Sequence, residues 1–110
     1  MTQAHIFAIF TPASGKADRL RELLKDQSSQ VHQKEDYAVR FLLTEFLDKQ
    51  NPEFWLFETY TSAEATNKHT EESHFKTMTA AFQKEGILAK PPVVAKTSTV
   101  AGFDLDRKLL

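Results

Sequence analysis

The sequence predicts an α+β domain in which two helical regions pack on one face of a four-stranded antiparallel sheet, in the order βαββαβ of the ferredoxin-like arrangement. Short apolar runs alternate with longer segments whose apolar residues recur at helical spacing. Only a short turn separates residues 37–46 from 54–61, which makes these two strands an antiparallel pair. The length of 110 residues fits one domain, with a core over about 4–100 and a C-terminal tail at 101–110.

The first strand is expected over residues 4–11, an apolar run that ends at a proline. A helix follows over about 15–32, where Leu20 and Leu24 belong to an apolar stripe at helical spacing. Ser14 is expected to cap this helix, because a serine oxygen can accept a hydrogen bond from a free N–H group of the first turn.

The two aromatic-rich runs form the second and third strands. Ser62 is expected to cap the second helical region, and Gly86 is expected to end it. The pattern favours a break in this region near residues 70–73. After two prolines, residues 93–100 form the last strand, and the tail that follows has no predicted element.

Both faces of the predicted sheet are apolar. Alternate residues of a strand point to opposite faces, so Phe7 and Ile9 share one face while Ile6 and Phe10 share the other. Two helices can cover only one face, and a large apolar surface is unfavourable in water. We therefore expect a second copy of the chain to cover the other face, which gives a dimeric α+β barrel.

The composition excludes several classes of function. Lys and Arg number 14 against 15 for Asp and Glu, so there is no net charge suited to nucleic acid or anionic lipid. There is no cysteine, and the four histidines lack the spacing of metal ligands. No apolar run approaches the roughly 20 residues of a membrane span. We expect a cytoplasmic protein without a metal site, and neither nucleic acid nor a membrane as its partner.

Three segments carry a resemblance to a known family. They are the corner at residues 12–16 (PASGK), the start of the second strand at 35–37 (EDY), and the run at 58–75, which reads Glu, an aromatic, a Ser-led turn, Ala, His, Ser and Phe at fixed offsets. On these residues the chain resembles the antibiotic biosynthesis monooxygenase (ABM) domains of the dimeric α/β-barrel superfamily, over about residues 4–100.

The resemblance implies a homodimer with an apolar cavity between sheet and helices in each subunit. The best-known members of the family are small oxygenases that act on quinols or polycyclic aromatic polyketides without metal, flavin or haem. Other members are isomerases or haem-degrading enzymes, and some have no known activity. Ala8, His69 and Thr79 stand where the haem-degrading branch is expected to have Asn, Trp and His. Haem cleavage is therefore not expected, and the only predicted co-substrate is O2.

His69 and Glu58 are the candidate catalytic residues. A histidine at this place could hold a substrate oxygen or act as a general base near neutral pH, or it could only join strand and helix by hydrogen bonds. If the face that carries Glu58 is internal, burial raises the pKa of its carboxyl group and makes it a candidate base. The alternative for Glu58 is a structural ion pair across the strands with Arg40.

Candidate substrate-binding residues complete the predicted site. Tyr60 and His5 could donate hydrogen bonds to a phenolic or enolate oxygen, and each could instead have only a structural place. His74 is expected to be exposed. From the nine phenylalanines we select four as candidates for lining an apolar pocket: Phe7, Phe41, Phe75 and Phe82.

These observations favour a cofactor-independent monooxygenase that oxidises a small apolar aromatic, quinol-like or polyketide-like substrate with O2. Such a substrate can be deprotonated to a stabilised anion that reduces dioxygen, so the protein needs to bind it, deprotonate it and exclude water. Two alternatives use the same pocket. One is an isomerase of a small carbonyl compound, and the other is a homodimer that binds a small apolar molecule without chemistry.

Overall fold

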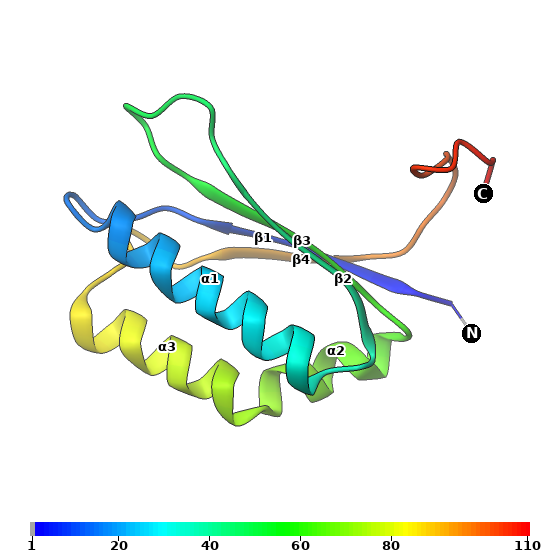
Figure 1. The fold of residues 1–110 in the computed structure, drawn as a ribbon, viewed down its shortest axis with the longest axis horizontal. Helices are drawn as coiled ribbons and strands as arrows, with labels where there is room; N and C mark the ends of the chain where they lie inside the picture. Colours follow the sequence, from blue (N-terminus) through cyan, green and yellow to red (C-terminus); the bar gives the residue numbers. More distant parts are fainter. Residues whose placement is uncertain (1) are drawn as a thin grey trace.

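The computed structural model describes residues 2–110, which form one antiparallel sheet of four strands and three helices. The strand order is β2-β3-β1-β4, and all three helices lie on one face of the sheet (Figure 1). The predicted ferredoxin-like α+β fold is confirmed. The elements are β1 (Ala4–Phe10), α1 (Ala17–Lys34), β2 (Ala38–Glu45), β3 (Phe54–Tyr60), α2 (Ala63–Glu71), α3 (Ser73–Glu85) and β4 (Val93–Thr97).

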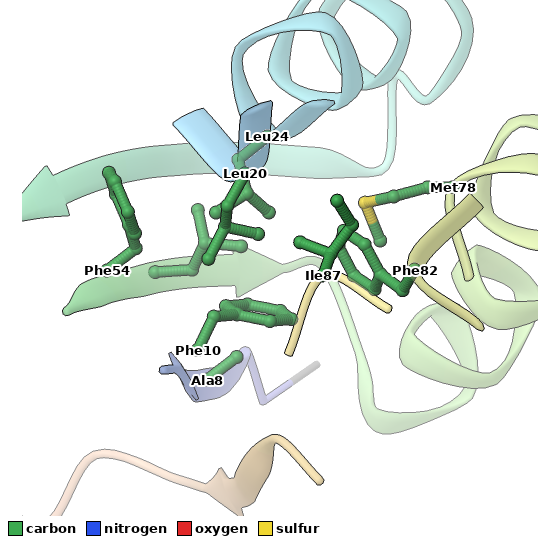
Figure 2. Close-up of a cluster of buried hydrophobic side chains, with 9 residues drawn as sticks. Ala8, Phe10, Leu20, Leu24, Phe54, Met78, Phe82 and Ile87 are labelled. Carbon is green, nitrogen blue, oxygen red and sulfur yellow. The ribbon is translucent and has the colours of Figure 1, made fainter. Parts of the chain in front are cut away.

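The main core lies between the helices and the face of the sheet that they cover. Phe10 from β1 and Phe54 from β3 pack in one cluster with Leu20 and Leu24 of α1, and the Phe10 ring extends toward Phe82 and Ile87 (Figure 2). The strands alternate as expected, because every second residue of β1 from Ala4 onward is buried. No helix within residues 2–110 is long and apolar enough to cross a membrane.

The helix boundaries agree with the sequence at most ends. The Ser62 hydroxyl accepts a hydrogen bond from the Ala65 N–H at 3.2 Å, and Gly86 ends α3 in the left-handed conformation with φ of 60°. The predicted cap at Ser14 is wrong. A turn closed by the Lys16 N–H and the Ala13 carbonyl at 2.9 Å contains Ser14, so α1 begins only at Ala17.

The second helical region is broken where the pattern favoured a break. The backbone of Glu72 is extended, with ψ of 143°. This residue is both the C-cap of α2 and the N-cap of α3. The hydroxyl of Tyr37, the residue before β2, donates a hydrogen bond to the Glu72 carboxyl group at 2.9 Å. This hydrogen bond holds the break between the two helices beside the end of the sheet.

The last strand is shorter than predicted. β4 covers Val93–Thr97 and pairs only with β1, where the last matched pair is His5 with Thr97. β1 continues to Ala4, but residue 98 does not pair with it, so the prediction of a strand to Val100 is wrong. The chain then leaves the sheet as an exposed tail (Figure 1).

The register between β2 and β3 shifts by one residue between Ala38 and Arg40. A shift of one residue moves a side chain to the other face of a sheet. Arg40 consequently lies opposite Thr59 on the face away from the helices, and Phe41 lies opposite Glu58. The predicted ion pair between Glu58 and Arg40 is therefore wrong, and the Arg40 guanidinium pairs with Asp104 of the tail instead.

The face of the sheet away from the helices stays apolar and uncovered in a single chain. Phe7, Phe57 and Leu42 form one row across three strands. Phe7 is 42% exposed and Leu42 52% exposed, and Trp55 in the next row is 40% exposed. Covering of this face by a second copy of the chain stays a prediction.

Candidate active site

A cavity of about 690 Å³ lies between the helix-facing side of the sheet and the second helical region. This volume lies within the usual range for pockets that hold small organic ligands. Its apolar wall comes from all four strands and α3, and the side chains that matter most here are Ile6, Phe41, Leu56, Phe75, Met78 and Phe82. Exposed residues of the 89–92 segment, together with Lys96, form its rim.

The buried polar side chains in this wall are, within residues 2–110, Gln27, Glu58 and His69. Gln27 comes from α1, Glu58 from the buried face of β3 and His69 from α2. A few polar groups in an otherwise apolar cavity fix the orientation of a ligand and are the first candidates for chemistry.

His69 is held in one orientation by a buried carboxylate. Its Nδ1 lies 2.7 Å from Glu35 Oε1, and the side chain of Glu35 is fully buried. An ionised carboxylate only accepts hydrogen bonds, so Nδ1 carries the proton and donates it to Glu35. In the neutral ring this leaves Nε2 with a lone pair, at 3.8 Å from Glu58 Oε1. A carboxylate that fixes a histidine tautomer in this way prepares the other ring nitrogen to act as a base.

Glu35 binds a second histidine as well. The Nε2 of His74 lies 2.5 Å from Glu35 Oε2, so both carboxylate oxygens are used. Burial by itself would raise the pKa of Glu35, but the hydrogen bonds from His69 and His74, with the charge that these rings carry when they are protonated, outweigh burial and lower it. Glu35 is therefore the charged member of this cluster.

The prediction that His74 is exposed is wrong, since it is only 8% exposed. In a continuous helix, residues 69 and 74 would point to different faces. The extended backbone at Glu72 turns α3 away from the direction of α2, and both rings then reach the same carboxylate.

Glu58 has the opposite electrostatic environment. Burial raises the pKa of its carboxyl group, and a hydrogen bond from the Tyr60 hydroxyl at 2.6 Å offsets only part of that effect. Burial also raises the pKa of Tyr60, so the phenol keeps its proton. The site thus combines a carboxyl group whose pKa is raised by burial with a histidine whose Nε2 is nearby.

The structure brings together most of the site residues that the sequence predicts. Phe41, Phe75 and Phe82 line the cavity beside His69 and Glu58. Tyr60 lies behind the wall, where it contacts Glu58.

Two of the predicted residues lie elsewhere. His5 and Phe7 occupy the opposite face of the sheet, because odd-numbered residues of β1 point away from the helices. The His5 ring instead contacts the Thr59 and Thr99 hydroxyls, at 2.9 and 2.7 Å. Neither residue is part of this cavity in the single chain.

Sequence reasoning missed Glu35, Gln27 and the inward position of His74. Gln27 could have been found, because it falls on the apolar stripe of α1 between Leu24 and Val31, where a polar residue is out of pattern. Glu35 follows the last turn of α1 and has no such periodic signal. Among residues 2–110, no three His, Cys, Asp or Glu side chains are arranged to hold a metal ion.

Comparisons with known proteins identify relatives of the chain. The family model described as Antibiotic biosynthesis monooxygenase matches residues 4–81. No curated protein sequence matches the chain.

Solved structures with the same fold include Rv0793 from Mycobacterium tuberculosis, which is 26% identical, with a TM-score of 0.79 over 90% of this chain and 96% of that one. A protein from Caulobacter crescentus, provisionally assigned as an antibiotic biosynthesis monooxygenase, is 21% identical, with a TM-score of 0.79 over 90% and 91%. PA3566 from Pseudomonas aeruginosa is 19% identical, with a TM-score of 0.80 over 92% and 97%.

Proposed function

The chain belongs to the antibiotic biosynthesis monooxygenase family, and from this membership and the lining of its cavity we propose that it is a cofactor-independent monooxygenase. The proposed substrate is a small apolar aromatic compound such as a quinol or an anthrone-like phenol. Three phenylalanines, Phe41, Phe75 and Phe82, support this substrate class, because they offer flat apolar surface in a cavity of suitable size.

One observation carries the proposal. His69 stands in the apolar wall of the cavity with Nδ1 bound to the buried Glu35, which leaves Nε2 as the base. The fixed carboxylate also stabilises the imidazolium ion that forms when Nε2 takes a proton. Both features are what a general base needs in order to act on a bound substrate.

The reaction can be written so that atoms and electrons balance. For a substrate with a CH2 group between aromatic rings, His69 Nε2 takes one proton and leaves an anion that is delocalised over the rings. The anion transfers electrons to O2, a carbon–oxygen bond forms, and the resulting peroxide takes the proton back from His69 to give a hydroperoxide. Loss of water then leaves a C=O group. One oxygen atom enters the product, the other leaves as water, and the substrate supplies all four electrons.

The test is oxygen uptake by the purified protein, freed of metal by a chelator, with a panel of quinols and anthrones. We expect turnover above the autoxidation rate, and a fall of about 100-fold or more in His69→Gln, because a positioned base contributes about that much. His32→Gln is the matched control, since His32 is exposed in the last turn of α1. Uptake that never exceeds autoxidation would refute the oxygenase, and an unchanged rate in His69→Gln would refute the base.

A second candidate function is supported by the 3.8 Å separation of His69 Nε2 and Glu58 Oε1. A base beside a carboxyl group with a raised pKa is suited to isomerisation, in which one group removes a proton and the other returns one. Such a reaction needs no oxygen. Exchange of deuterium from solvent into a small ketone under anaerobic conditions would therefore identify an isomerase. Binding of a ligand with neither oxygen uptake nor deuterium exchange would indicate a protein that binds a small apolar molecule without chemistry.

We further propose that the protein acts as a cytoplasmic homodimer. The uncovered apolar face, with Phe7, Leu42 and Trp55, supports the second copy. The absence of cysteine agrees with the compartment, since disulfides are typical of secreted proteins of this size.

A further inference from the structure

We propose that Lys96 binds an acidic group of the ligand at the mouth of the cavity, so that the preferred substrate carries a carboxylate or a similar anion at the end away from the reacting atom. Lys90 supplies a second positive charge at the same mouth. This inference rests on the proposed function, because it concerns the substrate of the same cavity. It predicts that an aromatic acid binds more tightly than an uncharged compound of the same shape.

The first observation is the place of Lys96 in the sheet. Lys96 lies opposite Ile6, and Ile6 lies opposite Glu58, so these residues form one row across β4, β1 and β3. Directly paired residues point to the same face of a sheet, and all three line the cavity. Neighbouring strands lie about 4.8 Å apart, which puts the backbone of Lys96 about 10 Å from that of Glu58. One ligand of two or three fused rings can therefore contact both ends of the row.

The second observation is that the cavity opens along β4. This strand lies at the edge of the sheet and all of it is exposed, including Val94, which lines the cavity and is 56% exposed. His69 and Glu58, in contrast, are buried. A ligand whose reacting group lies beside His69 consequently has its other end at the mouth. An ionised group is favourable there, because it keeps part of its hydration.

The third observation is the charge of this mouth. Apart from His69, the acidic and basic side chains of the cavity wall within residues 2–110 are the buried Glu58 and the exposed Lys90 and Lys96. The mouth is therefore positive, although the whole chain has a net charge of −1.

The contacts of Lys96 leave its charge available. Its Nζ donates a hydrogen bond to Asn67 Oδ1 of α2 at 3.0 Å, and within the described chain neither Lys96 nor Lys90 forms an ion pair with a carboxylate. A neutral amide oxygen orients the ammonium group without neutralising it. An ammonium group has three N–H donors, so two remain for an anion.

The experiment compares two fluorescent ligands, 6-hydroxy-2-naphthoate and 6-hydroxy-2-naphthamide. They share the rings and the hydroxyl group and differ by one charge, because the carboxyl group is ionised at pH 7. Fluorescence titration gives the Kd of each compound. Lys96→Met keeps the length of the side chain and removes the charge, whereas Lys96→Arg keeps the charge. Lys76→Met is the matched control, since Lys76 is exposed on α3 and is not part of the cavity wall.

We expect the wild type to bind the acid about fivefold more tightly than the amide, as is typical of an ion pair that is partly exposed to water. Lys96→Met should lose most of this preference and bind the amide as before, and Lys96→Arg should keep the preference. Lys76→Met should match the wild type. The preference should also shrink as NaCl is raised from about 0.05 M to about 0.5 M, because salt screens an exposed ion pair.

Two results would overturn the inference. Equal Kd values for the acid and the amide in the wild type would refute it, and this comparison needs no variant and so does not depend on the folding of one. An unchanged preference in Lys96→Met would refute the role of Lys96. The lysine would then serve only to keep the edge strand from pairing with other sheets.

Oxygen uptake with the neutral quinols and anthrones separates this inference from the proposed function. Uptake above autoxidation together with equal Kd values would refute the acid preference alone. No uptake together with tighter binding of the acid would refute the oxygenase and leave a cavity that binds aromatic acids. A wild type that binds neither naphthalene compound would refute the inference, whatever its oxygen uptake.

Discussion

Two buried carboxyl groups flank His69, and their environments shift their pKa values in opposite directions. Glu35 contacts two histidine rings, whose hydrogen bonds outweigh the effect of burial and lower its pKa. Burial raises the pKa of Glu58, which has only a phenol as its hydrogen-bond partner. Titratable groups whose pKa values are pushed apart identify the members of an acid–base pair. Here Glu35 is the carboxylate that stays ionised, because its pKa is lowered. Glu58, whose pKa is raised, is the carboxyl group that can take up a proton beside the His69 ring.

The raised pKa of Glu58 predicts a pH dependence of stability. A folded pKa above the unfolded value of 4.5 gives a contribution that is full below pH 4.5 and is lost as the pH rises through the folded value. Glu58→Gln removes this titration and can still accept from the Tyr60 hydroxyl. We expect the Tm of Glu58→Gln minus that of the wild type to grow as the pH rises from 4 to 8. A difference that stays constant across this range would contradict the assignment.

The lowered pKa of Glu35 predicts the opposite dependence. Its contribution is present above the unfolded pKa of 4.5 and is lost as the pH falls through the lowered folded value. At pH 7, Glu35→Gln should lower the free energy of unfolding by about 3 kcal/mol, since one amide oxygen cannot replace the two carboxylate oxygens that the buried histidines bind. Urea unfolding measures this change. Glu71→Gln is the control, because Glu71 is exposed and its change should stay within about 0.5 kcal/mol.

At the level of the elements, the end of α3 is fixed by backbone conformation alone. Gly86 has φ of 60°, and a Cβ atom added there would meet nothing within 4 Å. The cost of Gly86→Ala is therefore the left-handed backbone itself, which we expect to lower the free energy of unfolding by about 1 kcal/mol. Gly86→Asn should cost less, since Asn tolerates this conformation better. Equal losses in thermal or urea unfolding would show that side-chain contacts, and not φ, decide the effect.

Most element boundaries could be predicted because they depend on local chemistry. Ser62 caps α2 with its own hydroxyl group, and Gly86 ends α3 because it has no side chain. The alternation of buried and less buried residues along the strands can be read directly from the sequence. Two features depend on long-range pairing and could not be predicted. One is the register shift at Arg40, which only the pairing of β2 with β3 reveals. The other is the convergence of His69 and His74 on Glu35, which follows from the direction of α3 after the break.

The same distinction explains which site residues could be predicted. Phe41, Phe75 and Phe82 lie on the buried sides of their elements, and periodicity finds such residues. Phe7 is equally apolar but belongs to the other face, and composition does not tell which face a pocket occupies. A buried partner such as Glu35, which is separated from His69 by 34 positions in the sequence, is invisible to local patterns.

At the scale of the whole molecule, the two faces of the sheet have different roles. The helices cover one face of the sheet (Figure 1), and the core between them is drawn in Figure 2. The cavity lies on this same face. On the other face Phe7, which is exposed in the single chain, stacks on the half-buried Phe57 with ring centroids 4.9 Å apart. Arg40 lies over the Phe57 ring at 5.0 Å and pairs with Asp104, so the tail is tied to the end of this face.

The apolar outer face predicts a homodimer that one charge can dissociate. Sedimentation equilibrium should give a mass about twice the 12.5 kDa of one chain. In a symmetric dimer each substitution occurs twice in the interface, so Phe7→Glu would bury two unpaired charges and should give a folded 12.5 kDa monomer. Ser29→Glu, at an exposed position of α1, should leave the dimer intact. A monomeric wild type, or a Phe7→Glu variant that stays dimeric, would contradict the assignment of this face as the interface.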